Sequence, residues 1–152
     1  MSLESVRAWF AKHAPDIEVL VTETSSATVA EAVSTHNVEP AQIAKTICVR
    51  AGEEKVLLIV TSGASRLDNK KFKAIFGVRP RMLGAEEVLA LTGHPVGGVC
   101  PFGLATPLPV YCDVSLKQFE IVVPAAGAGN AAVIIPTARM AELTKASWVE
   151  VC

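Results

Sequence analysis

The sequence lacks the signatures that mark many enzymes and metal proteins. It has no H-E-x-x-H, G-x-S-x-G, P-loop or dinucleotide-binding pattern, which argues against a metalloprotease, an α/β-hydrolase, a nucleoside triphosphatase and a dinucleotide-dependent enzyme. Its four cysteines form no C-x-x-C pair and have no histidine at zinc-finger spacing. Neither a disulfide framework nor a metal site is therefore expected, and no cofactor is indicated.

Long apolar segments and a strong net charge are also missing. The longest apolar run, from Val56 to Val60, is far too short to cross a bilayer. Residues 1–13 carry charges within an amphipathic pattern and lack the apolar region of a signal peptide. A net charge of −1 gives no global attraction to nucleic acid or to a membrane. These absences predict a soluble cytoplasmic protein with no membrane partner.

The composition that remains fits one apolar domain. Hydrophobic residues make up 51% of the chain, enough to bury a real core, and residues 1–152 are expected to form a single domain. Helix and strand patterns mix without strict β-α-β order, which predicts an α+β fold with a mixed, largely antiparallel, barrel-like sheet flanked by short helices. The expected helices cover residues 3–13, 28–36, 68–76, 85–92 and 136–143, and the expected strands 17–21, 46–50, 55–61, 108–112, 120–123, 131–135 and 148–151.

Two loops rich in small residues interrupt these elements. Residues 93–103 hold four glycines and two prolines with apolar Val96, Val99 and Phe102 between them, so this loop should lie against the core. Residues 124–130 form the second loop, as the oversized connection of a hairpin. Each loop is either a structural turn or a functional segment, and long loops in compact domains are more often functional.

Positive charge gathers in one stretch although the whole chain is nearly neutral. Six basic residues lie within sixteen positions and are opposed only by Asp68: Arg66, Lys70, Lys71, Lys73, Arg79 and Arg81. Such a run is either a solvated face or a surface that contacts phosphates.

Few side chains are candidates for chemistry. His94 and Cys100 could form a nucleophilic pair, although cysteine is also a common small buried residue. His13 and His36 lie in the patterns of surface helices. Lys45 lies next to the start of an expected core strand, so its ammonium either reaches out to solvent or points into a cleft. One lysine and two glycine-rich loops, without a triad, suit the stabilisation of charge on an oxygen by backbone N–H groups and a cation.

Three segments together resemble the YbaK/EbsC family, the prolyl-tRNA synthetase-associated editing domains. They are residues 44–47 (A-K-T-I), residues 67–71 (L-D-N-K-K) and above all residues 92–103 (T-G-H-P-V-G-G-V-C-P-F-G). Their order and spacing match the family over nearly the whole chain, from about Thr28 to Val151. The resemblance implies a barrel-like mixed sheet and a free-standing enzyme that hydrolyses the ester between a wrong amino acid and its tRNA.

The resemblance also implies roles for individual residues. Lys45 would bind the tRNA terminus and steady developing charge, and the backbone amides of Gly97, Gly98 and Val99 would face the ester carbonyl. Thr46 would shape the amino-acid pocket, and the loop from Gly127 to Asn130 would close it. That loop lacks the His-Pro that branches specific for alanine tend to carry, so alanyl specificity is not implied.

The implied reaction needs no protein nucleophile, because water attacks an ester that is already activated. Four basic residues would contact the tRNA: Arg66, Lys70, Lys71 and Lys73. The expected partners are aminoacyl-tRNA and a synthetase such as prolyl-tRNA synthetase. Two alternatives stay open at this point: a non-catalytic module that binds tRNA or a synthetase, and a thiol enzyme that uses Cys100.

Overall fold

The computed structural model describes residues 2–152. The α-helices are α1 (Ser2–His13), α2 (Val29–His36), α3 (Asn69–Phe76), α4 (Ala85–Thr92) and α5 (Thr137–Leu143), with 3-10 helices η1 (Pro40–Gln42) and η2 (Val114–Gln118). The strands are β1 (Leu20–Val21), β2 (Ile43–Arg50), β3 (Val56–Ser62), β4 (Arg81–Met82), β5 (Val110–Asp113), β6 (Ile121–Pro124), β7 (Ala131–Ala132), β8 (Ile135–Pro136) and β9 (Ser147–Val149). None of the helices within this range combines the length and the apolar character needed to cross a membrane.

The helix boundaries follow local capping signals in the sequence. Thr28 and Glu31 form a complete capping box at the start of α2, in which each side chain accepts a backbone N–H of the other residue. The Asp68 carboxylate accepts the first N–H groups of α3. Gly77 and Gly93 end α3 and α4 in the left-handed conformation that glycine adopts without steric cost.

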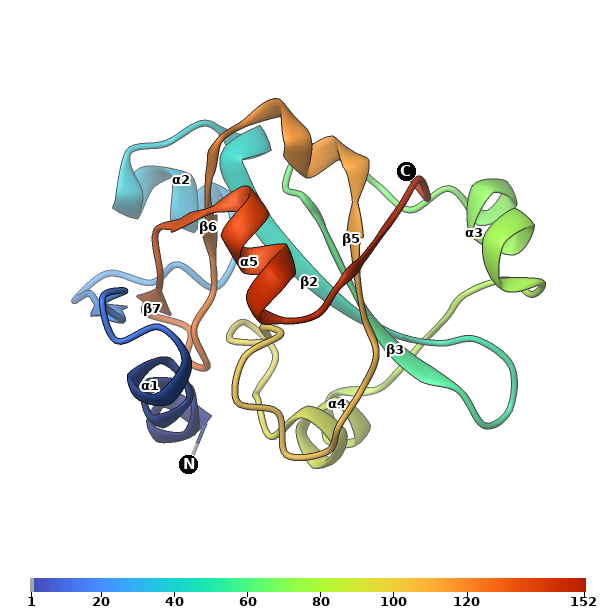
Figure 1. Ribbon diagram of the computed structural model, residues 1–152, viewed down its shortest axis with the longest axis horizontal. Helices are drawn as coiled ribbons and strands as arrows, with labels where there is room; N and C mark the ends of the chain where they lie inside the picture. The colour runs from blue at the N-terminus through green and yellow to red at the C-terminus, as the bar shows by residue number, and fades with distance from the viewer. Residues whose placement is uncertain (1) are drawn as a thin grey trace.

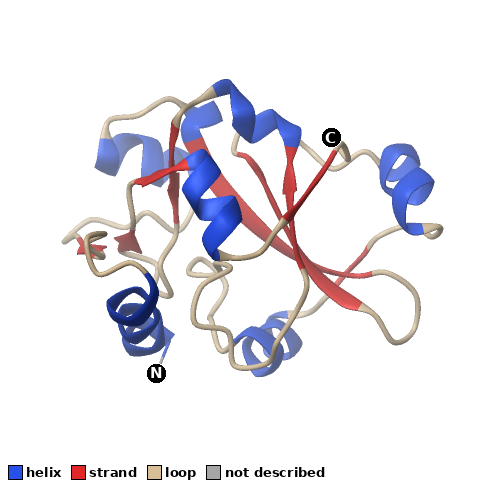
Figure 2. Ribbon diagram, viewed as in Figure 1, coloured by secondary structure: helices blue, strands red, loops and turns tan. Residues whose placement is uncertain are grey.

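A mixed sheet in the order β8-β6-β2-β3-β5-β9 forms the centre of the fold, and β4 also pairs with β2. β2 and β3 make the long antiparallel hairpin that the sequence predicts, whereas β2–β6, β3–β5 and β5–β9 are parallel. Figure 1 shows this sheet curling through the molecule, and Figure 2 shows the helices arranged around its edges. The predicted α+β class with a mixed, barrel-like sheet is confirmed.

The strand expected over residues 131–135 is broken into two short strands. Val122 of β6 pairs with Ile135 of β8, so the expected hairpin exists. Its first residues, Ala131 and Ala132, instead pair with β1. The hairpin connection is thereby held against the segment that leads into α2.

The two faces of β2 pack into different hydrophobic clusters. Ala44 and Cys48 belong to the large core that also contains Cys100 and Phe102. Ile47 belongs to a second cluster, centred on Phe72 of α3. Because side chains alternate along a strand, Lys45 shares the face of Ile47 and lies opposite Ala44.

Candidate functional site

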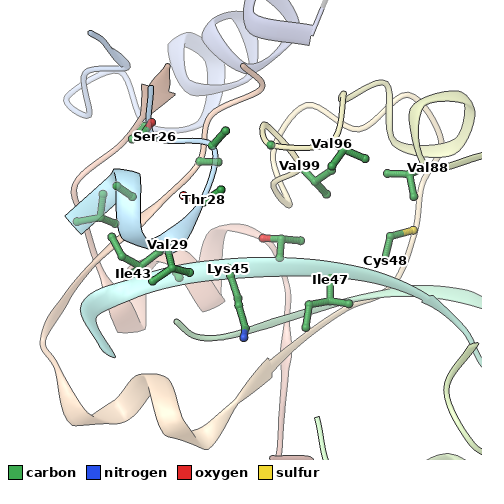
Figure 3. A pocket seen from close by; sticks show the side chains of 18 of the residues that line it. Ser26, Thr28, Val29, Ile43, Lys45, Ile47, Cys48, Val88, Val96 and Val99 are labelled. Carbon is green, nitrogen blue, oxygen red and sulfur yellow. The ribbon is translucent and has the colours of Figure 1, made fainter. Parts of the chain in front are cut away.

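A cavity of about 350 Å³ opens along the edge of β2 (Figure 3). β6 pairs with the first two residues of β2 and β4 with the last two, so within residues 2–152 no strand lies beside positions 45–48 on that edge. The start of α2 and the loop through Val96 and Val99 cover this gap. The fold therefore places an open strand edge at the floor of a cavity.

The inner wall of the cavity is apolar. It is formed by the cluster that packs α2 onto the sheet, with Val29, Ala32, Ile43, Val123 and Ala132. Met82 and Val96 line the cavity and are also strongly exposed, which gives it an apolar mouth. Such a cavity favours a small organic group over a hydrated ion.

The two glycine-rich loops pack directly against each other beside this cavity. The Gly127 N–H donates to the Gly98 carbonyl at 2.9 Å. A Cβ added to Gly98 would lie 2.5 Å from the Ala128 backbone nitrogen, so no larger residue fits there without moving a loop. Gly97 has a φ of +96°, a conformation that favours glycine, and it lines the cavity together with Val99.

The backbone N–H groups of this loop differ in their availability. The Gly98 N–H donates to the Pro95 carbonyl at 2.9 Å and so closes a turn. The N–H groups of Gly97 and Val99 have no hydrogen-bond acceptor within residues 2–152. Of the three amides that the resemblance implies, those of Gly97 and Val99 are therefore left for a ligand, whereas that of Gly98 is not.

The Lys45 ammonium lies away from the glycine-rich loop. Figure 3 shows the side chain leaving β2 on the side opposite Val96 and Val99. Its Nζ donates to the Ser65 carbonyl at 2.6 Å. Burial lowers the pKa of Lys45, and the nearby charge of Arg66 acts in the same direction. The lysine borders the cavity, but the structure does not bring its ammonium together with Gly97.

Two polar atoms of residues that line the cavity are buried without a partner. They are the Thr46 hydroxyl oxygen and Nε2 of His36, which have no hydrogen-bond partner within residues 2–152. Burial lowers the pKa of His36, so its imidazole is neutral. As the sequence pattern predicts, His36 lies on a helix at the surface, but the residue is half-buried and lines the cavity. Its spacing of four residues from buried Ala32 is the signal that places it on the packed face of α2.

His94 and Cys100 do come together, but inside the core. The Cys100 sulfur lies 3.5 Å from Nε2 of His94, and both residues have no exposed surface. Nε2 also lies 2.7 Å from the Phe102 carbonyl, so it carries the proton, and Nδ1 accepts from the Ser2 hydroxyl at 2.5 Å. Burial raises the pKa of the Cys100 thiol to about 12. A thiol that is buried and protonated cannot act as the nucleophile that the pair suggested.

The second loop is held by contacts outside the cavity. Nδ2 of Asn130 donates to the Thr22 carbonyl at 2.9 Å, and the Thr22 N–H donates to the Asn130 carbonyl at 2.8 Å. Gly127 packs on the backbone of Ser2 at the start of α1. Of the four residues expected to bind substrate, Thr46 and Val99 line the cavity, whereas Gly127 and Asn130 support the loops around it.

The basic stretch lies far from this cavity for most of its length. Arg66, Lys70, Lys71 and Lys73 are exposed, and Figure 1 places α3 and α2 at opposite ends of the molecule. Nζ of Lys71 donates to the Cys152 carbonyl at 2.7 Å, so part of this charge anchors the end of the chain. The two ends of the stretch come closer to the site. Arg81 precedes the cavity residues Met82 and Leu83, and Arg66 lies near the ammonium of Lys45.

Within residues 2–152, no three side chains of histidine, cysteine, aspartate or glutamate lie together in a way that could hold a metal ion. Apart from Lys45, the polar groups that line the cavity are backbone groups, the hydroxyls of Ser26, Thr28 and Thr46, the Cys48 thiol and the His36 imidazole.

Comparisons with known proteins agree with the resemblance found in the motifs. The sequence profile of the aminoacyl-tRNA editing domain matches residues 23–143. The uncharacterized protein YwhH of Bacillus subtilis is 45% identical over the whole chain and 98% of its own length. EbsC of Enterococcus faecalis, provisionally described as a Cys-tRNA(Pro)/Cys-tRNA(Cys) deacylase, is 26% identical over 84% of the chain and 76% of its own length.

A solved structure shares the same fold. It is provisionally described as a trans-editing enzyme for prolyl tRNA synthetase, and it superimposes with a TM-score of 0.91 and 31% identity over 99% of this chain and 96% of its own. The profile match covers most of the sequence and the common fold covers nearly all of it, and both indicate the same family. The chain belongs to the aminoacyl-tRNA editing domain family.

Proposed function

We propose that this protein is a trans-editing hydrolase that cleaves the ester bond of mischarged aminoacyl-tRNA. The observation that carries the proposal is a pair of N–H groups, those of Gly97 and Val99, that have no acceptor in the described part of the chain and lie at a cavity beside an open strand edge. Family membership supports the substrate class, since the related EbsC and the prolyl tRNA synthetase-related structure are both provisionally described as acting in tRNA editing.

The proposed mechanism uses the backbone rather than a side-chain nucleophile. Water attacks the carbonyl carbon of the ester, and the N–H groups of Gly97 and Val99 stabilise the oxyanion that forms. The bond between the carbonyl carbon and the ribose oxygen then breaks, and the ribose oxygen takes up the proton that the water releases. The products are the free amino acid and a tRNA with its terminal hydroxyl restored. Because the ester is already activated, positioning and charge stabilisation can supply the rate without a covalent intermediate.

Lys45 is proposed to act from the opposite face of β2. Its hydrogen bond to the Ser65 carbonyl ties the middle of the strand to the loop after β3, and so fixes the floor of the cavity. Contact with the terminal phosphate of the tRNA requires the ammonium to leave Ser65 and turn to the other face. Lys45→Met keeps the stem and removes the ammonium, so the melting temperature then reports the bond to Ser65 and KM reports the phosphate contact.

The remaining substrate contacts are proposed from charge. Arg66, Lys70, Lys71 and Lys73 would follow the acceptor stem, and Arg81 would bring positive charge close to the cavity mouth. With a net charge of only −1 on the protein, delivery by a synthetase such as prolyl-tRNA synthetase would strengthen binding. These partners place the activity in the cytoplasm, where tRNA is charged.

Release of amino acid from purified aminoacyl-tRNA tests the proposal. The full chain is incubated with tRNA carrying each of a panel of correct and incorrect amino acids, with and without synthetase. We expect hydrolysis of at least one mischarged species, and a loss of about 10²-fold or more in Lys45→Ala. Binding of tRNA without hydrolysis of any member of the panel would show a non-catalytic module instead.

The Lys45→Met variant then distinguishes a contact with the tRNA phosphate from structural support of β2. If the ammonium contacts the phosphate, Lys45→Met raises KM while the melting temperature stays close to that of the wild type. If it holds the strand, the melting temperature falls and kcat falls with it.

A further inference from the structure

We infer that His36 and Thr46 select the amino acid, and that the cavity takes a short, uncharged side chain ending in a group that both donates and accepts a hydrogen bond. This inference rests on the proposed function, and it names the class of substrate and one residue, His36, that the sequence motifs do not include.

The two residues reach the cavity from different elements. His36 is the last residue of α2, and Thr46 lies near the middle of β2. Yet the Nε2 atom of one and the Oγ1 atom of the other are the buried side-chain polar atoms without a partner within residues 2–152, and both residues line this cavity. Most buried polar groups in folded proteins are hydrogen-bonded, because an unpaired one has lost water without replacement. Two such atoms at one cavity point to a ligand that supplies the partners.

The chemistry of the two groups narrows the ligand. A hydroxyl donates one hydrogen and accepts others, and a neutral imidazole nitrogen does either according to its tautomer. A hydroxyl or thiol on the substrate can complement either group. A methyl group of the same size would leave both groups buried and unpaired, so a pocket of this kind discriminates strongly against it.

The rest of the cavity excludes charged and large side chains. Its inner wall is built from Val29, Ala32, Ile43, Val123 and Ala132, which offer no partner to a carboxylate or an ammonium. Lys45 is the one residue with a charged side chain among those that line it within residues 2–152, and its ammonium points away and is bonded to Ser65. A volume of about 350 Å³ must also hold the ester and part of the terminal ribose, so only a short side chain fits.

Isosteric substrate pairs test the inference. The full chain is assayed with tRNA carrying serine, cysteine or 2-aminobutyrate, and with the pair threonine and valine. We expect kcat/KM for a hydroxyl or thiol substrate to exceed that for its methyl counterpart by about 10-fold or more. The comparison of serine with cysteine separates the two polar groups.

Substitutions of His36 and Thr46 should abolish the preference for a hydroxyl or thiol substrate over its methyl counterpart. His36→Leu and the isosteric Thr46→Val should each bring the ratio towards 1 by lowering the rate on the polar substrate, with little change for the methyl one. His13→Leu is the matched control, since His13 is exposed on α1 and does not line the cavity, and it should leave the ratio unchanged. Ratios that stay at the wild-type value in both cavity variants would overturn the inference while leaving hydrolysis in place.

A binding measurement keeps the inference testable if no substrate is hydrolysed. The probes are the non-hydrolysable 3′-amides of adenosine with serine and with 2-aminobutyrate. Imidazole NMR should show a shift of the His36 ring on adding the seryl amide, and this amide should bind about 10-fold more tightly than its counterpart. Selective binding without hydrolysis would reject the proposed reaction and support the inferred selectivity for a hydroxyl side chain. Equal binding of the two amides would overturn the selectivity.

Discussion

Two regions of this molecule each contain a histidine and a small side chain that bears a hydroxyl or thiol, and they use them in opposite ways. In the core, His94 lies between Ser2, Cys100 and Phe102, and both ring nitrogens have partners. At the cavity, Nε2 of His36 and Oγ1 of Thr46 have none within residues 2–152. The first pair resembles catalytic machinery in the sequence, and the second does not.

The difference teaches that proximity and residue type do not identify a functional pair. His94 holds the glycine-rich loop to the start of α1, so its hydrogen bonds are consumed by the fold. The His36 and Thr46 atoms at the cavity have no protein partner within residues 2–152, so their hydrogen bonds are left for a ligand. We expect function where polar groups have no hydrogen-bond partner within the protein.

The largest expected effect is at Gly98, which lies where the two regions meet. In Gly98→Ala the new Cβ would lie 2.5 Å from the Ala128 nitrogen, so the loop that carries the Gly97 and Val99 amides must move. Loss of one such donor costs about 10²–10³-fold in rate, and we expect a decrease of that order in single-turnover deacylation.

Gly84→Ala is the matched control for this substitution. Gly84 precedes α4, and nothing lies within 4 Å of its added Cβ. Activity close to wild type in Gly98→Ala would show that the packing of the two glycine-rich loops is not needed for the reaction.

The second prediction applies one substitution to both histidines. His94→Leu leaves the Ser2 hydroxyl and the Phe102 carbonyl without their ring partners, and should lower the free energy of unfolding by about 1–3 kcal/mol. His36→Leu removes an unpaired polar atom and should leave stability unchanged or raised. Urea unfolding measures the free energy of unfolding of both variants. Equal decreases in the two variants would contradict the difference proposed between the core and the cavity.

A third prediction extends the comparison to a buried carboxylate whose bonds are satisfied. Asp113 accepts from the backbone N–H groups of Ser115 and Val151 at 2.9 and 2.8 Å. Burial disfavours its charge, but the hydrogen bonds from Ser115 and Val151 outweigh burial, so the pKa of Asp113 is lowered. Asp113→Asn should cost about 1.5–3 kcal/mol at neutral pH, the range for hydrogen bonds to a charged group.

The sign of the pH dependence follows from the lowered pKa. The stabilisation by Asp113 is fully present above its unfolded pKa near 3.8 and is lost as the pH falls through the lower folded value. Stability curves of wild type and Asp113→Asn should therefore converge at acidic pH. Curves that stay parallel down to the acid transition would argue that the carboxylate charge plays no part.

The smallest effect is expected at Cys100. Because its thiol is buried with a pKa of about 12, iodoacetamide should not modify it in the native protein at neutral pH. Cys100→Ala should change deacylation by less than about twofold, since no bond to the thiol forms in the proposed reaction. Peptide mass spectrometry and the deacylation assay check both points, and inactivation by alkylation at Cys100 would restore the thiol enzyme as an explanation.

Local features of the fold were readable from the sequence because they depend on neighbouring residues. The helices expected over residues 28–36 and 68–76 and the strands expected over residues 46–50 and 55–61 are present, with the Thr28–Glu31 capping box, the Asp68 cap and the β2–β3 hairpin defining them. The resemblance carried by residues 44–47, 67–71 and 92–103 correctly indicated the family. The split of residues 131–135 was not readable, because it depends on β1 offering a second partner.

Placement of the site residues required the tertiary structure. The sequence by itself determined the α+β class, the family and the two glycine-rich loops, since these depend on short-range patterns and spacing. The fold decided that Lys45 faces Ser65, that the Gly98 N–H closes a turn, and that His36 lines the cavity. These outcomes follow from strand register and from which buried groups find partners. Both depend on contacts between residues far apart in the chain.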